Sequence, residues 1–275
     1  MIGEIRMGIF DRDYRILTED EKEEYKIIKE KEIINSSSGK KSRFRKILFH
    51  EYPKAARHYM HLFPNNYLDI VELKDVDILN KKSKDFEQLL ENQCKEQEIL
   101  KFLKDNKAYF IVASILKRNY NFGHHAAYIF PEFQLGTEYR ADYLLIGRSS
   151  GGYEFVFVEL ESPNGSITTK DGELGYVFRK GIKQIKDWSR WLERNYSTLR
   201  ELYKKDLKEG DELPTEFIEY DSSRIHFVVI AGRRDDFNNL TYIIKREMFK
   251  NENLLLLHYD NLVDFSVDVA GKSTY

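Results

Sequence analysis

The sequence predicts an α/β fold, in which a mixed β-sheet is flanked by helices and preceded by an N-terminal accessory region. Two apolar segments, ADYLLIG (141–147) and EFVFVELE (154–161), are separated by a short glycine-containing turn and predict an antiparallel hairpin. Farther along, RIHFVVIAG (224–232) and NLLLLHY (253–259) are strand-like and enclose a helical pattern over 236–249. A strand, a helix and a second strand in this order predict a parallel pair at the end of the sheet.

Helical periodicity marks further segments of the chain. Residues 84–106 and 173–194 each carry apolar side chains at helical spacing, and 260–269 reads as a closing helix. The N-terminal part reads as irregular apart from a helix at 19–33 and a small, polar linker at 35–42. We therefore expect an accessory region over residues 1–80 and the main domain over 81–275.

Composition indicates a soluble, cytoplasmic protein without a membrane segment. The single cysteine, Cys94, cannot form an intramolecular disulfide, which favours a reducing compartment. The N-terminus lacks the basic and then apolar pattern of a signal peptide. The apolar stretches are of core-strand length, far short of the roughly 20 residues that a membrane helix needs.

One segment is strongly basic, although the formal net charge of the chain is only −2. Residues 40–57 hold seven basic side chains against one acidic side chain. Because Lys and Arg contact phosphates, this segment is a candidate DNA-binding patch, with a solvated loop as the alternative. Its basic residues are Lys40, Lys41, Arg43, Arg45, Lys46, Lys54 and Arg57, and its acidic residue is Glu51.

Three apparent motifs are rejected because of their surroundings. GRSSG (147–151) matches a hydrolase nucleophile motif, but a strand follows where that motif needs a helix, so Ser149 is expected in a hairpin turn. SGKKS (38–42) lacks the first glycine and the hydroxyl residue of a phosphate-binding loop. The neighbouring His124 and His125 diverge in regular structure, so they are not expected to chelate one ion.

Chemistry is expected around VELE (158–161). On a strand, residues two apart share a face, so Glu159 and Glu161 point the same way, roughly 6–7 Å apart. The hairpin brings a third acid, Asp142, from another apolar strand. Burial and like charge both penalise ionised carboxylates, and a divalent cation such as Mg²⁺ or Mn²⁺ relieves both penalties. The alternative for each acid is an ion pair with Lys or Arg at a strand end.

The helix predicted at 173–194 carries a stripe that completes this candidate site. Lys180, Gln184 and Trp188 are four residues apart and therefore share one helix face. Gly181 lies beside the stripe and permits a close approach to a sheet. A glutamine in this place can orient water or a phosphate, and a lysine can offset charge at the reacting phosphorus.

These residues resemble the signature of the restriction-endonuclease-like PD-(D/E)XK nucleases. Asp142 is followed by a hairpin, by Glu159-Leu160-Glu161, and by a helix in which Gln184 and Trp188 match the accessory Q-x-x-x-Y motif. The runs PEFQLGTEYRADYLLIG, FVELESPNGSITTKDGELG, KQIKDWSRWL and LLHYDNLVDF are similar to the C-terminal nuclease domain of Shedu anti-phage defence proteins. This resemblance covers residues 84–270.

The resemblance implies a restriction-endonuclease-like sheet, DNA cleavage, and a homo-oligomer, commonly a tetramer. It also implies a sensor role for residues 1–80 and an additional acid on the helix before the sheet, here Glu98. The chain departs from the superfamily pattern at Glu161, which stands where a lysine is usual. Lys180 or Lys183 of the helix, or Lys170 of the preceding loop, can replace that lysine in space.

The sequence thus predicts a metal-dependent DNA endonuclease of anti-phage defence that uses Mg²⁺ or Mn²⁺. One alternative is a catalytically silent nucleic-acid-binding protein that retains the fold. Another is a carboxylate-pair hydrolase acting on sugars, which would remain active in a chelator. The expected metal ligands are Asp142, Glu159, Glu161 and Glu98. The expected catalytic residues are Asp142, Glu159, Glu161, Gln184 and Lys180.

Overall fold

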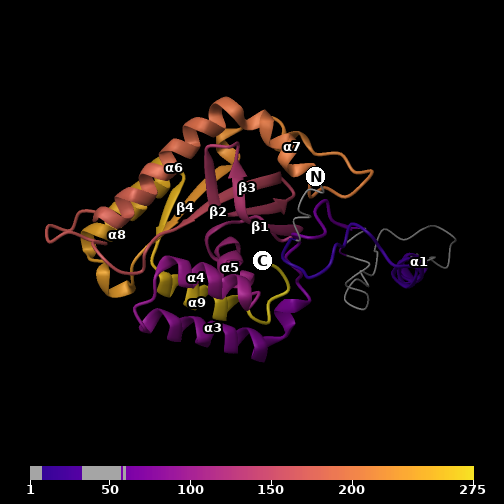
Figure 1. The fold of residues 1–275 in the computed structure, drawn as a ribbon, viewed down its shortest axis with the longest axis horizontal. Helices are drawn as coiled ribbons and strands as arrows, with labels where there is room; N and C mark the ends of the chain where they lie inside the picture. Colours follow the sequence, from indigo (N-terminus) through magenta and orange to yellow (C-terminus); the bar gives the residue numbers. More distant parts are fainter. Residues whose placement is uncertain (1–7, 33–56, 58–59) are drawn as a thin grey trace.

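A five-stranded mixed sheet forms the centre of the computed structural model, which describes residues 8–32, 57 and 60–275 (Figure 1). The strand order is β1-β2-β3-β4-β5, with antiparallel pairing from β1 to β3 and parallel pairing from β3 to β5. The predicted hairpin and the predicted parallel pair are both confirmed. The strands are β1 (Ala126–Leu135), β2 (Tyr139–Ser149), β3 (Gly152–Leu160), β4 (Ile225–Ile230) and β5 (Leu254–Leu257).

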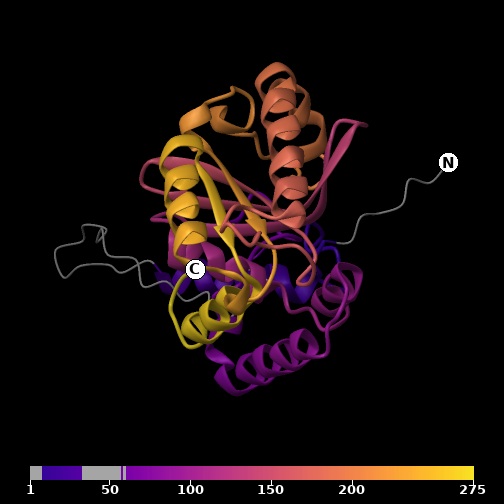
Figure 2. The same ribbon diagram turned by 90° about the vertical axis from the view of Figure 1, so that its left-hand side faces the viewer.

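Helices cover both faces of this sheet (Figures 1 and 2). Successive residues of β3 point to opposite faces of the sheet, and both are buried because helices cover both faces. Val158 lies in one core and Phe157 in the other. The first face is covered by α3 (Val76–Glu91), α4 (Glu96–Asp105), α5 (Tyr109–Asn119) and α9 (Tyr259–Val269). The second face is covered by α6 (Tyr176–Asn195), α7 (Leu199–Tyr203) and α8 (Asn239–Glu252). Short 3-10 helices, η1 (Glu72–Lys74), η2 (Tyr196–Thr198), η3 (Thr215–Phe217), η4 (Ser222–Arg224) and η5 (Arg234–Asp236), lie in the connections.

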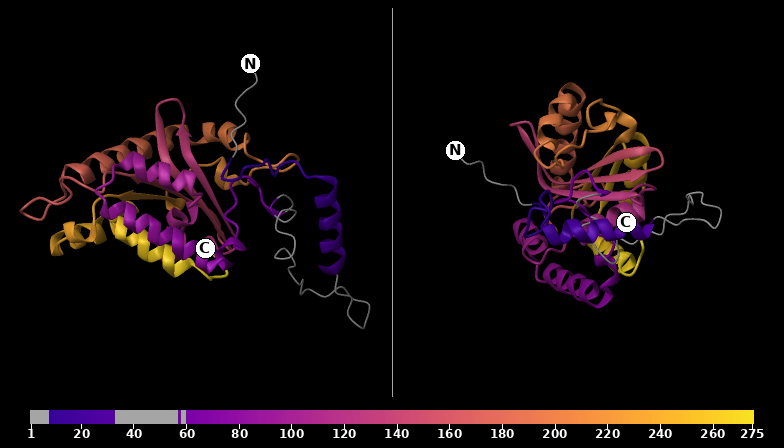
Figure 3. Two further views of the ribbon diagram at one scale, coloured as in Figure 1. Left: turned by 60° about the horizontal axis from the view of Figure 1, so that its bottom comes forward. Right: turned by 90° about the vertical axis from the view of Figure 1, so that its right-hand side faces the viewer.

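The N-terminal residues contribute to both cores. Phe63 packs on the α6 side of the sheet and Leu73 on the α9 side, while Tyr67 forms an antiparallel bridge with Tyr128 of β1. The helix α1 (Glu19–Glu32) matches the expected one and stands away from the sheet (Figure 3). The division of the chain at residue 80 stays a prediction.

The single helix expected over 84–106 is instead two helices, α3 and α4. They are separated at residues 92–95, where Gln93 has a left-handed φ of 51°. Lys95 then begins α4 in an extended conformation. Residues 91–98 hold no apolar side chain except Cys94, so the apolar spacing within the two halves does not mark where one helix ends and the next begins.

The basic segment 40–57 lies outside the described residues except for Arg57. That side chain is buried and forms ion pairs with Asp69 at 2.9 Å and Glu72 at 3.0 Å. It also lies over the ring of Phe10, with 4.1 Å between the guanidinium carbon and the ring centre. Arg57 therefore has a structural role and is a correction to the predicted phosphate-contacting set.

Two of the rejected motifs lie where their surroundings indicated. Ser149 ends β2 at the hairpin turn, where its hydroxyl accepts a hydrogen bond from the Gly151 N–H at 3.1 Å. His124 and His125 are both exposed in the loop that precedes β1. SGKKS (38–42) falls outside the described residues. Over the part of the chain that the structure does describe, no helix combines the length and the apolar character needed to cross a membrane.

Candidate active site

The β2–β3 hairpin brings Asp142 next to the carboxyl end of β3. The β2–β3 pairing ends with Tyr143 opposite Val158, so Asp142 comes one step farther, beside Glu159. Its Oδ2 accepts a hydrogen bond from the Leu160 N–H at 2.7 Å. This bond fixes one carboxylate oxygen of Asp142 against the backbone of β3.

Glu161 follows the last residue of β3 and is held by its own backbone. Its N–H donates to the Ile230 carbonyl of β4 at 2.8 Å, and its carbonyl accepts from the Tyr259 hydroxyl at 2.6 Å. Glu161 is only 1% exposed and Glu159 5%, so both acids are buried. Sequence analysis did not single out Tyr259, whose hydroxyl holds this backbone.

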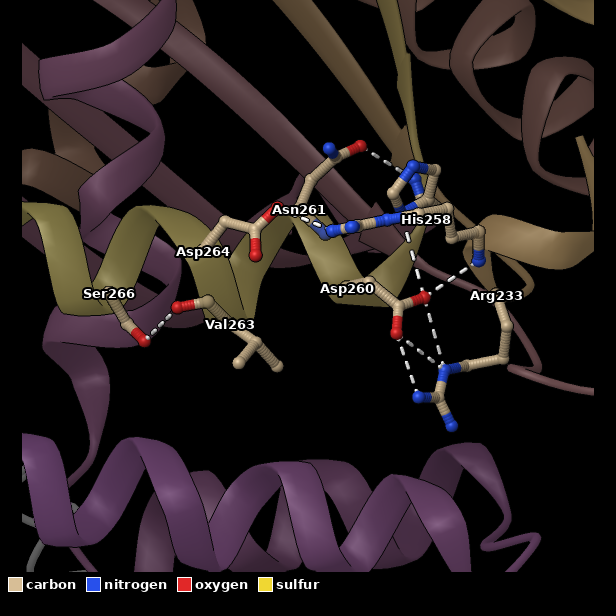
Figure 4. A network of polar contacts seen from close by, with 8 residues as sticks. Arg233, His258, Asp260, Asn261, Val263, Asp264 and Ser266 are labelled. Atoms are coloured by element: carbon tan, nitrogen blue, oxygen red, sulfur yellow. Dashed lines mark hydrogen bonds and ion pairs between the residues drawn. The ribbon is translucent and has the colours of Figure 1, made fainter.

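The loops at the carboxyl ends of β3, β4 and β5 are tied together beneath this site. The Gly232 N–H donates to the Ser162 carbonyl, and the Gly232 carbonyl accepts from the Tyr259 N–H. Arg233 then reaches the Asp260 carboxylate at the start of α9, with 2.7 Å between Nη2 and Oδ1 (Figure 4). The loops are thus anchored to α9, which gives Glu161 a rigid support.

The helix α6 supplies the polar partners of both glutamates. Lys180 Nζ lies 2.7 Å from Glu161 Oε2, and Gln184 Nε2 donates to Glu159 Oε1 at 2.7 Å. Because the two helix residues are one turn apart and the two glutamates share a face, each helix residue meets one acid. The close approach depends on Gly181, where a Cβ atom would lie 2.7 Å from the Val229 Cγ1.

The surroundings of the three acids disfavour their ionised forms. Burial, followed by the charges of neighbouring acids, raises the pKa of Glu159 to about 9. Burial raises the pKa of Asp142 to about 7 against the hydrogen bond from Leu160, which lowers it. Burial also raises the pKa of Glu161, although the bond from Lys180 opposes this. A positive charge placed among these groups would therefore stabilise their ionised forms.

Two buried carboxylate oxygens lack a partner. Glu159 Oε2 and Glu161 Oε1 each have no hydrogen bond among the described residues. An unpaired buried acceptor is costly, and hard oxygen donors suit Mg²⁺ or Mn²⁺. The chemistry of these oxygens fits such an ion. As they stand, though, no three Asp, Glu, His or Cys side chains in the described part of the chain are grouped closely enough to hold one ion.

The structure does not bring Glu98 to this group. Glu98 is exposed, and its Oε2 accepts a hydrogen bond from the Lys95 N–H at 2.8 Å, so it caps its own helix. Glu96 is the α4 acid whose charge raises the pKa of Asp142, Glu159 and Glu161. Sequence analysis missed Glu96 because it took Glu98 from the family resemblance and did not see the break before α4. With that break known, a glutamate three residues after the cap reads as a capping residue.

Lys180 contacts Glu161, the residue that occupies the lysine position of the superfamily motif. Burial lowers its pKa, but the hydrogen bond and the charge of Glu161 outweigh burial and raise it, so Lys180 stays protonated. Lys183 and Lys170 are exposed. For Glu161, the ion pair with Lys180 is also what the alternative interpretation predicts, in which the acid pairs with a basic residue at a strand end. Glu159 has a neutral partner instead.

A family model described as "Shedu protein SduA, C-terminal" matches residues 93–263 of the chain. The match spans every strand of the described sheet and the acids Glu96, Asp142, Glu159 and Glu161. A search among curated proteins found no match to the chain.

Proposed function

The chain belongs to the Shedu family, which supports a role in anti-phage defence, and we propose that it acts there as a metal-dependent DNA endonuclease. The reaction is hydrolysis of a phosphodiester bond in DNA, assisted by Mg²⁺ or Mn²⁺. The protein works as a homo-oligomer, as the family resemblance implies.

One observation carries this proposal. Asp142, Glu159 and Glu161 are gathered at one end of a buried sheet, and two of their buried oxygens have no partner among the described residues. Within the described part of the chain, one of the three acids has a cationic partner, Lys180 beside Glu161. If Glu159 formed a structural ion pair, its pKa would not be raised and its Oε2 would not lack a partner among the described residues.

Asp142 and Glu159 would hold the ion, with Glu161 beside them. A bound divalent ion supplies Lewis acidity toward the phosphate and the leaving oxygen. The side chains of the site orient the ligands and accept the proton of the attacking water. Gln184 fixes one oxygen of Glu159 by hydrogen bond and so orients the other.

Glu161 and Lys180 act together on the attacking water. Glu161 Oε1 accepts a hydrogen bond from that water and then its proton, since the raised pKa of Glu161 makes it a better proton acceptor than an exposed carboxylate. Lys180 holds Glu161 Oε2 and places a positive charge near the phosphate, where negative charge develops. This assigns to a helix residue the role that the superfamily motif gives to a strand lysine.

Purified full-length protein is expected to nick or cut plasmid DNA with Mg²⁺ or Mn²⁺ and to stop in excess EDTA. The reason is that three buried acids with raised pKa values need an added positive charge to act as anions. Gel analysis of supercoiled plasmid across several divalent metals measures this.

Two outcomes would contradict the proposal. Cleavage that persists undiminished in EDTA would remove the metal requirement. Tight DNA binding without cleavage in any metal, using relaxed, linear and single-stranded substrates, would favour a silent nucleic-acid-binding protein instead.

A further inference from the structure

A cleft of about 520 Å³ opens directly beside the candidate active site. Asp142 and Tyr143 of β2 line it, and its other walls come from α4, from the start of α5 and from β1. The N-terminal region closes it through Gly8 and Asn66. The volume falls within the roughly 300–1,000 Å³ that is usual for small-ligand sites. One acid of the active site is therefore also a wall of a ligand-sized cleft.

Asn66 gives this cleft an unsatisfied hydrogen-bond acceptor. The residue is 3% exposed, its Nδ2 donates to the Ile129 carbonyl at 3.0 Å, and its Oδ1 has no partner among the described residues. Turning the amide around would place Oδ1 against the carbonyl oxygen of Ile129, so the orientation is fixed. The oxygen itself is buried, so a small shift of the cleft wall must precede contact with a ligand N–H group, and the bond formed then removes a penalty.

The remaining lining separates into apolar walls and a basic rim. Leu100, Tyr109 and Pro131 are half-buried and offer apolar and aromatic surface, and Lys101 and Lys104 are exposed on α4. A flat ring with an N–H edge fits between such walls, and a phosphate fits at such a rim. Nucleotides combine these three features.

The carboxylates of the cleft do not exclude a phosphate. Glu132 forms an ion pair with Arg140 at 3.0 Å, and the charge of Asp206 acts on Arg15, whose pKa it helps to raise. Asp142 belongs to the candidate ion site. Of the four acids that line the cleft, only Asp105 is left to offset the lysines at the rim.

We propose that this cleft binds one unpaired nucleotide of the DNA strand that is being cut. The base lies between Leu100 and Tyr109 with an N–H group toward Asn66 Oδ1, and its phosphate meets Lys101 and Lys104. The assignment rests on the proposed endonuclease function, because Asp142 then brings the neighbouring phosphate to the carboxylates. A free nucleotide shares this chemistry, so the test separates the two sources.

Binding is measured in EDTA, so that the result does not depend on cleavage. The probe is a short duplex with one bulged 2-aminopurine, compared with the same duplex fully paired and with 2-aminopurine deoxyribonucleoside monophosphate alone. The full-length protein is expected to bind the bulged duplex about tenfold more tightly than the paired one, as one stacked base allows. The fluorescence of the bulged base should change on binding.

The double variant Lys101→Ala/Lys104→Ala tests the rim. It should lose most of this preference, and the log–log salt slope should shrink by roughly 0.7 to 0.9 for each lysine. Lys81→Ala/Lys84→Ala is the matched control, since it removes the same charge from exposed positions on α3, away from the cleft. Leu100→Trp fills the cleft without touching its hydrogen bonds and should abolish the preference for the bulge.

Equal affinity for bulged and paired duplexes would overturn the proposal, as would an equal loss in the α3 control. Binding of the free mononucleotide but not of the bulged duplex would also overturn it and assign the cleft to a free ligand. A protein that cuts plasmid but shows no bulge preference disproves this inference alone. A protein that binds the bulge but never cuts disproves the endonuclease proposal alone.

Discussion

Glu159→Gln is expected to lower DNA cleavage by more than about a hundredfold. Changing only the outer partners of metal ligands typically costs 10–100-fold, and Glu159 is a proposed ligand itself. The substitution keeps the shape of the side chain, and its carbonyl oxygen can still accept the hydrogen bond from Gln184. Cleavage rates at saturating Mg²⁺ measure the effect, with DNA affinity measured separately in EDTA.

Glu154→Gln on the same strand serves as the control for this variant. Glu154 hydrogen-bonds with His226 at 2.8 Å and lies five residues, roughly 17 Å, before Glu159 on β3. The control should cut at the wild-type rate. A Glu159→Gln protein that cuts normally would refute the proposed role, whatever its stability.

The pH dependence of stability gives this variant a second readout. The folded-state pKa of Glu159 is raised from 4.5 to about 9, so folding favours its protonated form, which stabilises the protein at low pH. That contribution is lost as pH rises through the folded-state value. In EDTA, the Tm of the wild type should therefore fall more steeply between about pH 5 and 9 than the Tm of Glu159→Gln. Parallel curves would show that the folded-state pKa of Glu159 is not raised.

Lys180→Met is expected to lower cleavage by roughly 10²- to 10³-fold, the usual cost of removing one group that stabilises transition-state charge. The substitution also takes the hydrogen bond from Glu161 Oε2, which leaves that carboxylate with no partner among the described residues. The rate constant at saturating DNA and metal should carry most of the loss.

Lys183→Met provides the matched control, because it removes the same charge from an exposed position on the same helix. Its cleavage rate should stay within a few-fold of the wild type. If Lys183→Met is inactive and Lys180→Met is active, the charge-neutralising lysine is Lys183. If both variants cut normally, α6 supplies no lysine to the reaction.

Local patterns were sufficient for the strands and helix that build the site. β3 could be recognised because a short apolar run leads into two acids on one face, and α6 because its apolar residues recur at helical spacing. The pairing of Lys180 with Glu161 and of Gln184 with Glu159 came from the structure. Two acids on a strand whose two faces are otherwise apolar were the sequence feature that predicted the site.

Other elements left no such pattern. In α5, residues Phe110–Leu116 are all buried, so this helix has no polar face and no helical period to detect. Much of β1 is likewise buried on both faces. The break between α3 and α4 depends on a left-handed Gln93, which the apolar spacing does not register. Knowledge of that break would have marked Glu98, which the family resemblance implied, as the capping residue of α4.

A divalent ion held by Asp142 and Glu159 is best tested by soaking crystals of the protein in Mn²⁺ and collecting data that reveal anomalous scattering. We expect an anomalous difference peak in contact with both carboxylates, which Glu159→Gln removes. The unpaired Glu159 Oε2 and the raised pKa values of both acids are the reasons for this expectation. Wild-type crystals without a peak at these carboxylates, at Mn²⁺ concentrations that support plasmid cleavage, would contradict it.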